Sequence, residues 1–254
     1  MILNWEEYAF LFDWELDAIN SHQTQDYKAW EKLSKLYGGK VLELGCGSGR
    51  IASKLRSAGV DITALDNSKF LINKLRREEP DFPAEKILLG DMLTYEFPEK
   101  YDFVFYSYST WQYLLNLEDQ KQALLHISKH LVQGGKIAFD ICPYTCDLPL
   151  EQPKTLLYKR YNKEIKREVS MYTSHRVDRI SQITTWQDSY VLEGAKGERD
   201  VLHHTLSLKG NRADFLELLL AHCGFKLISA YGDFDLNEVT PESDNIIYLA
   251  EKIS

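Results

Sequence analysis

The residues of this 254-residue chain that are best suited to chemistry form a glycine-rich turn. The apolar run VLEL (41–44) leads into GCGSG (45–49), and an amphipathic segment follows. Glycine lets the backbone adopt unusual angles and approach a ligand closely, where a side chain would hold the ligand off. A strand that ends in such a turn before a helix brings this backbone to the mouth of a parallel sheet, where ligands bind. The alternative interpretation is a tight strand-to-helix turn without a ligand.

Two aspartates follow the next two apolar runs. Asp66 lies 21 residues after Gly45, where a carboxylate can accept hydrogen bonds from both ribose hydroxyls of an adenosine. Asp91 comes at the end of the third run, where it can accept from an adenine amino group. As alternatives, Asp66 and its neighbours Asn67 and Ser68 could begin or cap a helix, and Asp91 could be a turn residue. Their occurrence at successive strand ends favours an adenosine-containing cofactor.

A dinucleotide is the competing ligand. Its fingerprint, GxGxxG, places the third glycine five positions after the first and a pyrophosphate at the helix N-terminus. Here the third glycine, Gly49, comes four positions after Gly45 and is followed by Arg50. This spacing favours a different adenosine cofactor.

The elements that must position these residues alternate short apolar runs with amphipathic segments. A helical region over residues 1–40 comes first, and the link over 91–100 leaves little room for a helix. This alternation predicts a parallel α/β sheet covered on both faces. The predicted strands span 41–44, 61–65, 86–89, 101–106 and 136–142; helices follow the first, second and fourth of them, and a helix over 212–223 precedes two final strands over 225–234 and 245–253.

Between the fifth strand and the last helix, the hydrophobic period changes to two. Three runs rich in β-forming residues (162–176, 179–192 and 198–208) predict an inserted antiparallel sheet. We therefore expect a cofactor-binding core over 1–142 and 204–254, with a substrate cover over 143–203. Residues 151–180 carry eight basic and four acidic side chains. This net +4 predicts either a surface that binds an anionic acceptor or a solvated outer face.

The composition of the chain limits the kinds of molecule that it is expected to bind. The net charge of −8 gives the chain no general attraction to nucleic acid or to an anionic membrane. The beginning of the chain is acidic and aromatic, unlike a signal peptide, and four cysteines are few, which predicts reduced thiols and a cytoplasmic location. Cys142 and Cys146 lack a second Cys/His pair at zinc-finger spacing, so no metal is expected. The expected partner is a small molecule, with the protein a monomer or homodimer.

Several segments together resemble the motif series of the class I S-adenosylmethionine-dependent methyltransferases, in their small-molecule branch. They are VLELGCGSGR (41–50), ITALDNS (62–68), LLGDM (88–92), YDFVFYSYS (101–109), LVQGGKIAFD (131–140) and the tail over 204–235. The resemblance implies S-adenosyl-L-methionine as cofactor and a doubly wound, seven-stranded, mostly parallel sheet with a C-terminal antiparallel hairpin. It implies cofactor contacts from Gly45, Cys46 and Gly47 to the methionine part, Asp66 with its neighbour Asn67 to the ribose, Asp91 to the adenine amine, Met92 to the adenine ring and Tyr106 beside the sulfonium.

The sequence indicates the catalytic residues less clearly than the cofactor-binding residues. Methyl transfer is an in-line displacement, which an enzyme accelerates mainly by holding the nucleophile close, aligned and dry. A hydroxyl or ammonium acceptor must also lose a proton. His203 and Tyr106 are the candidate bases, whereas His204 shares an apolar face and fits a packed core histidine. The other available bases are Asp140 and Tyr108.

Four side chains are predicted to contact the acceptor. Tyr108 and Trp111 follow the fourth strand, near the expected methyl donor, where aromatic rings can stabilise a cation. Arg176 and Arg179 lie in the insertion and could bind an anionic acceptor. The predicted function is therefore methyl transfer to an oxygen or nitrogen of a small molecule. An RNA methyltransferase, which the charge of −8 disfavours, and a non-catalytic, cofactor-binding regulatory protein are the alternatives.

Overall fold

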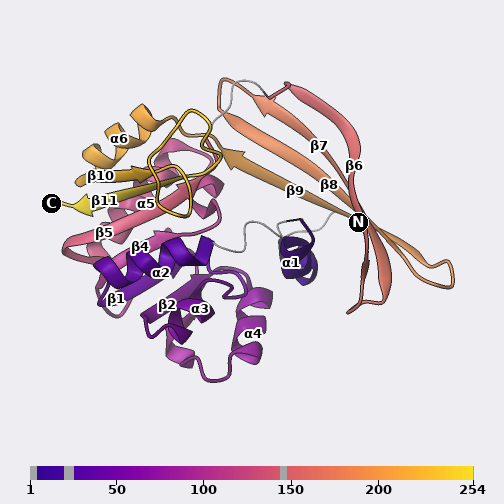
Figure 1. Ribbon diagram of the computed structural model, residues 1–254, viewed down its shortest axis with the longest axis horizontal. Coiled ribbons are helices and arrows are strands. Elements are labelled where there is room, and N and C mark those ends of the chain that lie inside the picture. The colour runs from indigo at the N-terminus through magenta and orange to yellow at the C-terminus, as the bar shows by residue number, and fades with distance from the viewer. Residues whose placement is uncertain (1–4, 20–25, 144–147, 254) are drawn as a thin grey trace. The chain divides into compact units, whose positions relative to one another are not determined.

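A computed structural model describes residues 5–19, 26–143 and 148–253. The chain divides into two compact units, each made of two stretches of sequence (Figure 1). One contains residues 1–21 and 145–210, and the other contains residues 22–144 and 211–254. We call them the antiparallel unit and the core unit. Cys146, one of the two cysteines weighed above as metal ligands, lies outside the described residues.

The core unit is built on a seven-stranded sheet in the order β10-β11-β5-β4-β1-β2-β3. Strands β1 to β5 pair in parallel, whereas β11 is antiparallel to both β5 and β10. The predicted five parallel strands and the C-terminal antiparallel hairpin are confirmed. The strands are β1 (Lys40–Leu44), β2 (Asp61–Asp66), β3 (Ile87–Leu89), β4 (Tyr101–Tyr106), β5 (Leu131–Ile141), β10 (Phe225–Tyr231) and β11 (Ile246–Lys252).

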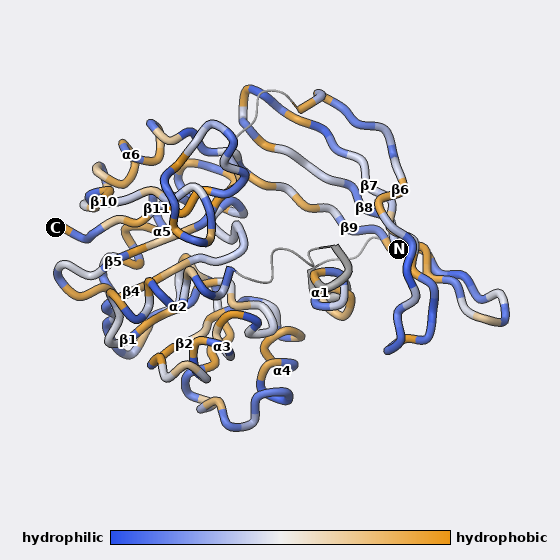
Figure 2. The backbone as a smooth tube through the Cα atoms, viewed as in Figure 1, coloured by the Kyte–Doolittle hydropathy of each residue, from blue (hydrophilic) through white to orange (hydrophobic). Residues whose placement is uncertain are grey.

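Helices cover both faces of this sheet, as its apolar strands require. One hydrophobic cluster joins the sheet to α5 (Leu117–His130) and α6 (Ala213–His222). The other joins it to α2 (Asp26–Tyr37), α3 (Ala52–Ser57) and α4 (Lys69–Glu78). The central strands are predominantly apolar in Figure 2 because both of their faces are buried. The described part of the unit also contains the short 3-10 helices η2 (Ala84–Lys86) and η3 (Thr110–Tyr113), and residues 90–100, all of them described, form no helix between β3 and β4.

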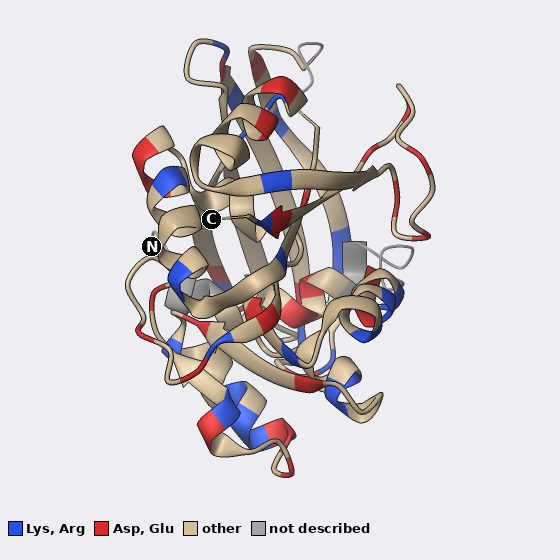
Figure 3. Cartoon of the chain, turned by 90° about the vertical axis from the view of Figure 1, so that its left-hand side faces the viewer, with Lys and Arg blue, Asp and Glu red and all other residues tan. Residues whose placement is uncertain are grey.

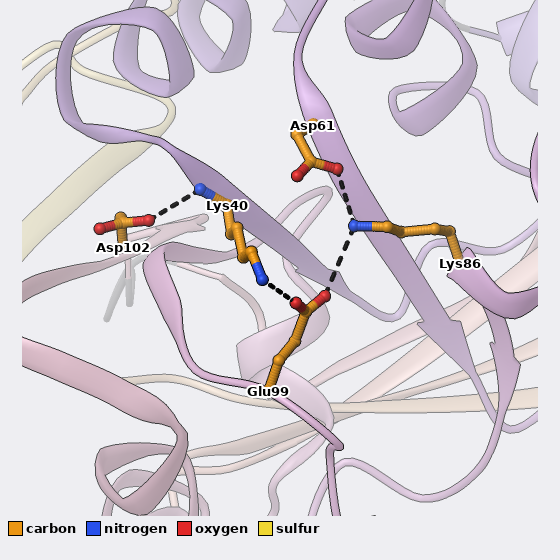
Figure 4. A network of polar contacts seen from close by, with 5 residues as sticks. All are labelled: Lys40, Asp61, Lys86, Glu99 and Asp102. Atoms are coloured by element: carbon orange, nitrogen blue, oxygen red, sulfur yellow. Dashed lines mark hydrogen bonds and ion pairs between the residues drawn. The ribbon is translucent and has the colours of Figure 1, made fainter.

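An ionic network ties together the amino-terminal ends of the parallel strands (Figure 4). Lys86 donates to Asp61 at 2.7 Å and lies 3.4 Å from Glu99, which also pairs with Lys40. The Lys40 backbone N–H donates to the Asp102 carboxylate at 2.7 Å. These contacts link β1, β2 and β4 at the edge opposite the glycine turn, and so they belong to the scaffold.

The antiparallel unit is a four-stranded sheet in the order β6-β7-β8-β9. The helix α1 (Trp5–Ile19) packs on it through Leu11, which joins a cluster with Val169, Met171 and Tyr190. Three strands were predicted and four are present: β6 (Glu151–Asn162), β7 (Arg167–Asp178), β8 (Ile183–Glu193) and β9 (Arg199–Lys209).

The division of the chain differs from the predicted boundaries at the N-terminus. The region predicted as helical over 1–40 forms two helices, and α1 belongs to the antiparallel unit, whereas the sequence assigned it to the core. An apolar face of α1 packs against Val169 and Tyr190 of the antiparallel unit. An apolar face in the sequence predicts that a helix is buried, but it does not identify the surface against which the helix packs. Among the helices within the described ranges, none combines the length and apolar character needed to cross a bilayer.

Candidate functional site

The glycine turn lies where β1 ends, and its geometry requires glycine. Gly45, Gly47 and Gly49 have φ angles of +74°, +58° and +86°, in the left-handed region. The backbone N–H groups of Gly45 and Cys46 both donate to the Leu65 carbonyl, at 2.8 and 3.0 Å. A Cβ at Gly45 would lie 2.4 Å from Cγ2 of Thr110. The turn is thus held against the end of β2 and leaves no room for a side chain at position 45.

Asp66 ends β2 and connects this turn to the next helix. One carboxylate oxygen accepts from the Gly47 N–H and the other from the Ser68 N–H, both at 2.8 Å. Ser68 is the N-cap of α4, and Asn67 is exposed. The alternative interpretation of this segment as a helix start is therefore correct for Ser68. Asp66, only 7% exposed, orients the glycine turn and the start of α4 through these two hydrogen bonds.

Asp91 lies on the adjacent loop. Gly90 donates its N–H to the Asp66 carbonyl at 2.9 Å, which joins the ends of β2 and β3. Asp91 is exposed, and its Oδ1 accepts from the Leu93 N–H at 2.7 Å. Met92 is partly buried against the core. Asp91 is therefore a turn residue, as its alternative interpretation held, and it keeps a carboxylate at the surface beside a sheltered methionine.

Beneath the turn lies a buried polar network that sequence reasoning missed. Glu43, 1% exposed in the middle of β1, accepts a hydrogen bond from Ser107 Oγ at 2.7 Å through its Oε1. Its Oε2 has no hydrogen-bond partner among the described residues. Burial raises the pKa of Glu43 to about 8. The positive charge of Arg50 opposes this rise in pKa, and its guanidinium makes two 2.6 Å hydrogen bonds to the Asp26 carboxylate.

Asp140 near the end of β5 is the second buried carboxyl at this edge. Its Oδ2 accepts from the Ser109 N–H at 2.9 Å, and its Oδ1 has no hydrogen-bond partner within the described ranges. Burial raises the pKa of Asp140 to about 7. Tyr108 and Ser109 have φ angles of 54° and 58°, which are costly for residues other than glycine. Asp140 therefore holds a strained turn after β4, and the Arg50 guanidinium lies 5.5 Å from the Tyr108 ring centroid.

Tyr106 and Trp111 are core residues at the same edge. Both are completely buried, with ring centroids 5.6 Å apart in an edge-to-face contact. Trp111 also stacks on Phe139 at 4.7 Å. The Tyr106 hydroxyl and the Trp111 indole nitrogen lack hydrogen-bond partners in the described structure. The Trp111 ring packs against both Tyr106 and Phe139, and its contact with the acceptor stays a prediction.

Comparison with known proteins identifies the family. Residues 41–135 match a family described as a methyltransferase domain. The cypemycin N-terminal methyltransferase of a Streptomyces species is 34% identical over 114 residues, which cover 44% of this chain and 46% of the relative, so the match spans less than half of that relative's length. The CcbJ methyltransferase from Streptomyces caelestis shares the fold with a TM-score of 0.76 at 19% identity, covering 91% of this chain and 96% of that chain.

A structure solved with the cofactor bound is similar as well. CalS10, described as an amino pentose methyltransferase from Micromonospora echinaspora, has a TM-score of 0.70 at 14% identity, covering 95% of this chain and 96% of that chain, and holds S-adenosylmethionine. Residues 41–135 therefore form a methyltransferase domain, and the chain shares the fold of solved methyltransferases, CalS10 with bound S-adenosylmethionine among them. The structure confirms the predicted fold, and these matches support the predicted family and S-adenosylmethionine as its cofactor.

The residues at the carboxyl edge of the methyltransferase sheet fit that cofactor. It carries a cationic sulfonium and an ammonium group, and Glu43 and Asp140 each present a buried carboxyl oxygen for which the described residues supply no hydrogen-bond partner. Buried polar atoms normally have partners, so such oxygens are expected where a ligand supplies the missing donor or positive charge. Cys46, whose thiol pKa is raised by burial, packs in the core below the turn and offers backbone rather than thiolate chemistry.

The remaining predicted site residues belong to the antiparallel unit of the methyltransferase. His203 shares a 3.0 Å hydrogen bond with Ser189 Oγ. Buried His204 lies 3.7 Å from the Asp188 carboxylate, which agrees with its interpretation as a packed histidine.

Arg176 and Arg179, the predicted acceptor contacts of the insertion, are exposed. Arg176 lies 3.8 Å from Glu151, and Arg179 donates to the Leu148 carbonyl at 3.5 Å. These contacts favour the solvated outer face over an anion site. On the side of the molecule shown in Figure 3, where the core unit faces the viewer, basic and acidic residues are interspersed along the helices and loops.

Proposed function

We propose that this methyltransferase transfers a methyl group to a nitrogen or oxygen of a small-molecule acceptor, with an amino sugar as the first class to test. The observation that carries the proposal is the likeness of both units together to CalS10, named an amino pentose methyltransferase, over 95% of this chain. That likeness extends to the antiparallel unit, whereas the glycine turn by itself would support a likeness of the core unit only. The net charge of −8 agrees with a small acceptor rather than RNA.

The core unit would hold the cofactor through the edge of its sheet. Gly45, Cys46 and Gly47 would face the methionine part, with the carboxylate of Glu43 beneath them to complement positive charge. The Asp66 carboxylate, at the end of β2 and bonded to the glycine turn, would accept from the ribose hydroxyls.

The neighbouring loops would complete the cofactor site. Asp91, at the exposed end of β3, would accept from the adenine amine, with Asn67 nearby and Met92 against the adenine ring. Tyr106 would lie beside the sulfonium, with its hydroxyl buried and without a partner in the described structure. Each of these roles is open to substitution and a binding measurement.

The chain's own residues would position the acceptor, exclude water and accept one proton from the acceptor. When bound, the cofactor supplies an electrophilic methyl group on a cationic sulfur. The strained turn at Tyr108 and Ser109 is fixed by Asp140 before any ligand arrives, which limits the motion of the groups beside the nucleophile. The buried side chains of Tyr106 and Trp111 exclude water from this edge.

The proton of an ammonium or hydroxyl acceptor needs a base, and the structure favours Asp140 over the two bases predicted first. Burial raises the pKa of the Tyr106 hydroxyl, which disfavours the phenolate. His203 is already hydrogen-bonded to Ser189. Asp140 has a pKa raised to about 7 and an oxygen without a partner in the described ranges, and a base works best when its pKa lies near the working pH.

The test is methyl transfer followed by mass spectrometry over a panel of amino sugars, their hydroxyl analogues and RNA. We expect a methylated small molecule and a rate that rises with pH through about 7 in the wild type. Asp140→Asn is expected to lose that rise and at least about 100-fold in rate, whereas the exposed control Glu85→Gln is unchanged. Transfer only to RNA, or tight cofactor binding with no transfer to any acceptor, would overturn the proposal.

A further inference from the structure

A second group of ligand-type side chains lies in the core unit away from the residues assigned to the cofactor. Glu96, His126 and His130 each offer one potential ligand atom, and these atoms lie within 4.8 Å of one another. His126 and His130 are four residues apart in the last turns of α5, which places them on one face of the helix. Glu96 belongs to the segment that links β3 to β4. The group is therefore assembled from two separate parts of the chain.

The contact between His130 and Glu96 has the spacing of two metal ligands rather than of a hydrogen bond. Their nearest atoms, His130 Nε2 and Glu96 Oε2, are 3.5 Å apart. His130 Nε2 is buried and has no hydrogen-bond partner among the described residues, and 3.5 Å is longer than an ordinary hydrogen bond. Two ligands held about 2.1 Å from a tetrahedral zinc ion lie roughly 3.4 Å apart. The observed separation fits a shared ion.

The ring of His126 is oriented by contacts of the kind that surround metal-binding histidines. Its Nε2 lies 2.9 Å from the Tyr95 carbonyl oxygen. Because a carbonyl can only accept, Nε2 must carry the hydrogen, and a neutral ring then has Nδ1 as its unprotonated nitrogen. A backbone carbonyl that accepts from one ring nitrogen fixes the tautomer and leaves the other nitrogen for a metal.

One buried aromatic residue fixes both imidazoles. The Phe97 ring centroid lies 6.5 Å from that of His126 and 5.1 Å from that of His130, and the two imidazole centroids are 5.1 Å apart. Phe97 is 7% exposed and is itself part of the core cluster. Because Phe97 follows Glu96 directly, its packing also anchors the third ligand beside α5.

We propose that Glu96, His126 and His130 bind one divalent transition-metal ion of the zinc type, with solvent in the remaining position. Two imidazoles and one carboxylate are a ligand set that zinc accepts. The ion would tie the segment between β3 and β4, which begins at Asp91, to the end of α5, and so it would stabilise the core unit. The sequence gives no sign of this site in the form of clustered Cys/His pairs, because Glu96 and His126 are 30 positions apart.

The probes are zinc itself and cobalt, applied to full-length protein without a histidine tag. Calorimetry is expected to give one equivalent of Zn²⁺, Co²⁺ to give the visible absorption bands of a tetrahedral site, and Zn²⁺ to raise the melting temperature. Glu96→Gln keeps the shape of a side chain that is 78% exposed, so the fold is preserved in this variant. It should weaken Zn²⁺ binding by more than about 10-fold, and His130→Gln by more than about 100-fold, since even residues behind the ligands are worth 10- to 100-fold.

The matched control is His222→Gln, an exposed histidine on α6 of the same unit. It should bind Zn²⁺ with wild-type affinity. If the wild type binds no Zn²⁺, or if Glu96→Gln and His130→Gln bind it as tightly as the wild type does, the proposal is wrong. Neither outcome depends on methyl transfer, so the metal site and the proposed function can fail independently.

Discussion

Replacing Glu43 with glutamine is expected to stabilise the protein at alkaline pH and to weaken cofactor binding at the same time. Glu43 is 1% exposed, with one oxygen bonded to Ser107 and the other without a partner in the described structure. Glutamine keeps the size of the side chain and an acceptor for the Ser107 hydroxyl while it removes the charge. The substitution therefore measures separately what the buried charge costs in folding stability and what it contributes to cofactor binding.

The magnitude follows from the pKa of Glu43, which burial raises from 4.5 to about 8. The folded state holds this proton more tightly than the unfolded chain. The free energy of unfolding therefore falls as the pH rises from 4.5 to about 8, and above the folded pKa the penalty is fully present. At about 1.4 kcal/mol per pKa unit, the penalty is roughly 5 kcal/mol. Glu43→Gln removes it, whereas any unfavourable effect of the new amide is the same at every pH.

The assay is urea denaturation without cofactor at pH 5 and pH 9, with exposed Glu85→Gln as the control. The advantage of Glu43→Gln over the wild type should grow by several kcal/mol between the two pH values, and the control should follow the wild type. Calorimetry at pH 8 should show S-adenosylhomocysteine binding at least about tenfold more weakly to Glu43→Gln, since a charged hydrogen bond is worth about 1.5–3 kcal/mol. A stability difference independent of pH, or an unchanged affinity, would refute the reasoning.

Three further substitutions test the scaffold of the site. Gly45→Ala places a Cβ 2.4 Å from Thr110 at a φ of +74°, which should cost about 3 kcal/mol in denaturant unfolding and abolish cofactor binding in calorimetry. Asp26→Asn leaves the part-buried Arg50 guanidinium without its charged partner, and a loss of about 3 kcal/mol in urea unfolding is expected; a loss below about 0.5 kcal/mol would contradict this. Ser68→Ala removes the N-cap of α4 and should lower the free energy of unfolding by about 1 kcal/mol, with cofactor affinity kept.

The parallel core could be predicted from the sequence because its signals are local. Short, mostly apolar runs, three of them followed by glycine or aspartate, identify the buried parallel strands, and the structure confirms all five. The strand β6 (Glu151–Asn162) was missed because most of its residues are exposed, so neither of its faces shows an alternating apolar pattern. The position of α1 was missed for a different reason, since its covering surface is formed by residues about 150 positions later in the chain.

The candidate site could be predicted in part. Asp66 and Asp91 lie on adjacent loops, as strand-end positions imply, and a hydrogen bond from Gly90 joins those loops. The burial of the Glu43 and Asp140 carboxyls beneath the turn was not predicted. A signal existed, because each is the one acidic residue of its strand and lies between apolar neighbours. The pairing of Arg50 with Asp26 could not be predicted, because no local sequence pattern relates a residue in the turn to a residue in the preceding helix.

Cofactor titration of matched variants tests the central claim most directly, namely that the ends of β1, β2 and β3 form the cofactor site. Calorimetry should show that the wild type binds S-adenosylhomocysteine and not NAD. Asp66→Ala should weaken this binding by about 2 kcal/mol or more, because two ribose hydroxyls lose their acceptor, and Asp91→Ala by about 1 kcal/mol at its exposed position. Glu85→Gln should bind as the wild type does. Equal affinity in Asp66→Ala and the wild type, or preferential binding of NAD, would contradict the account.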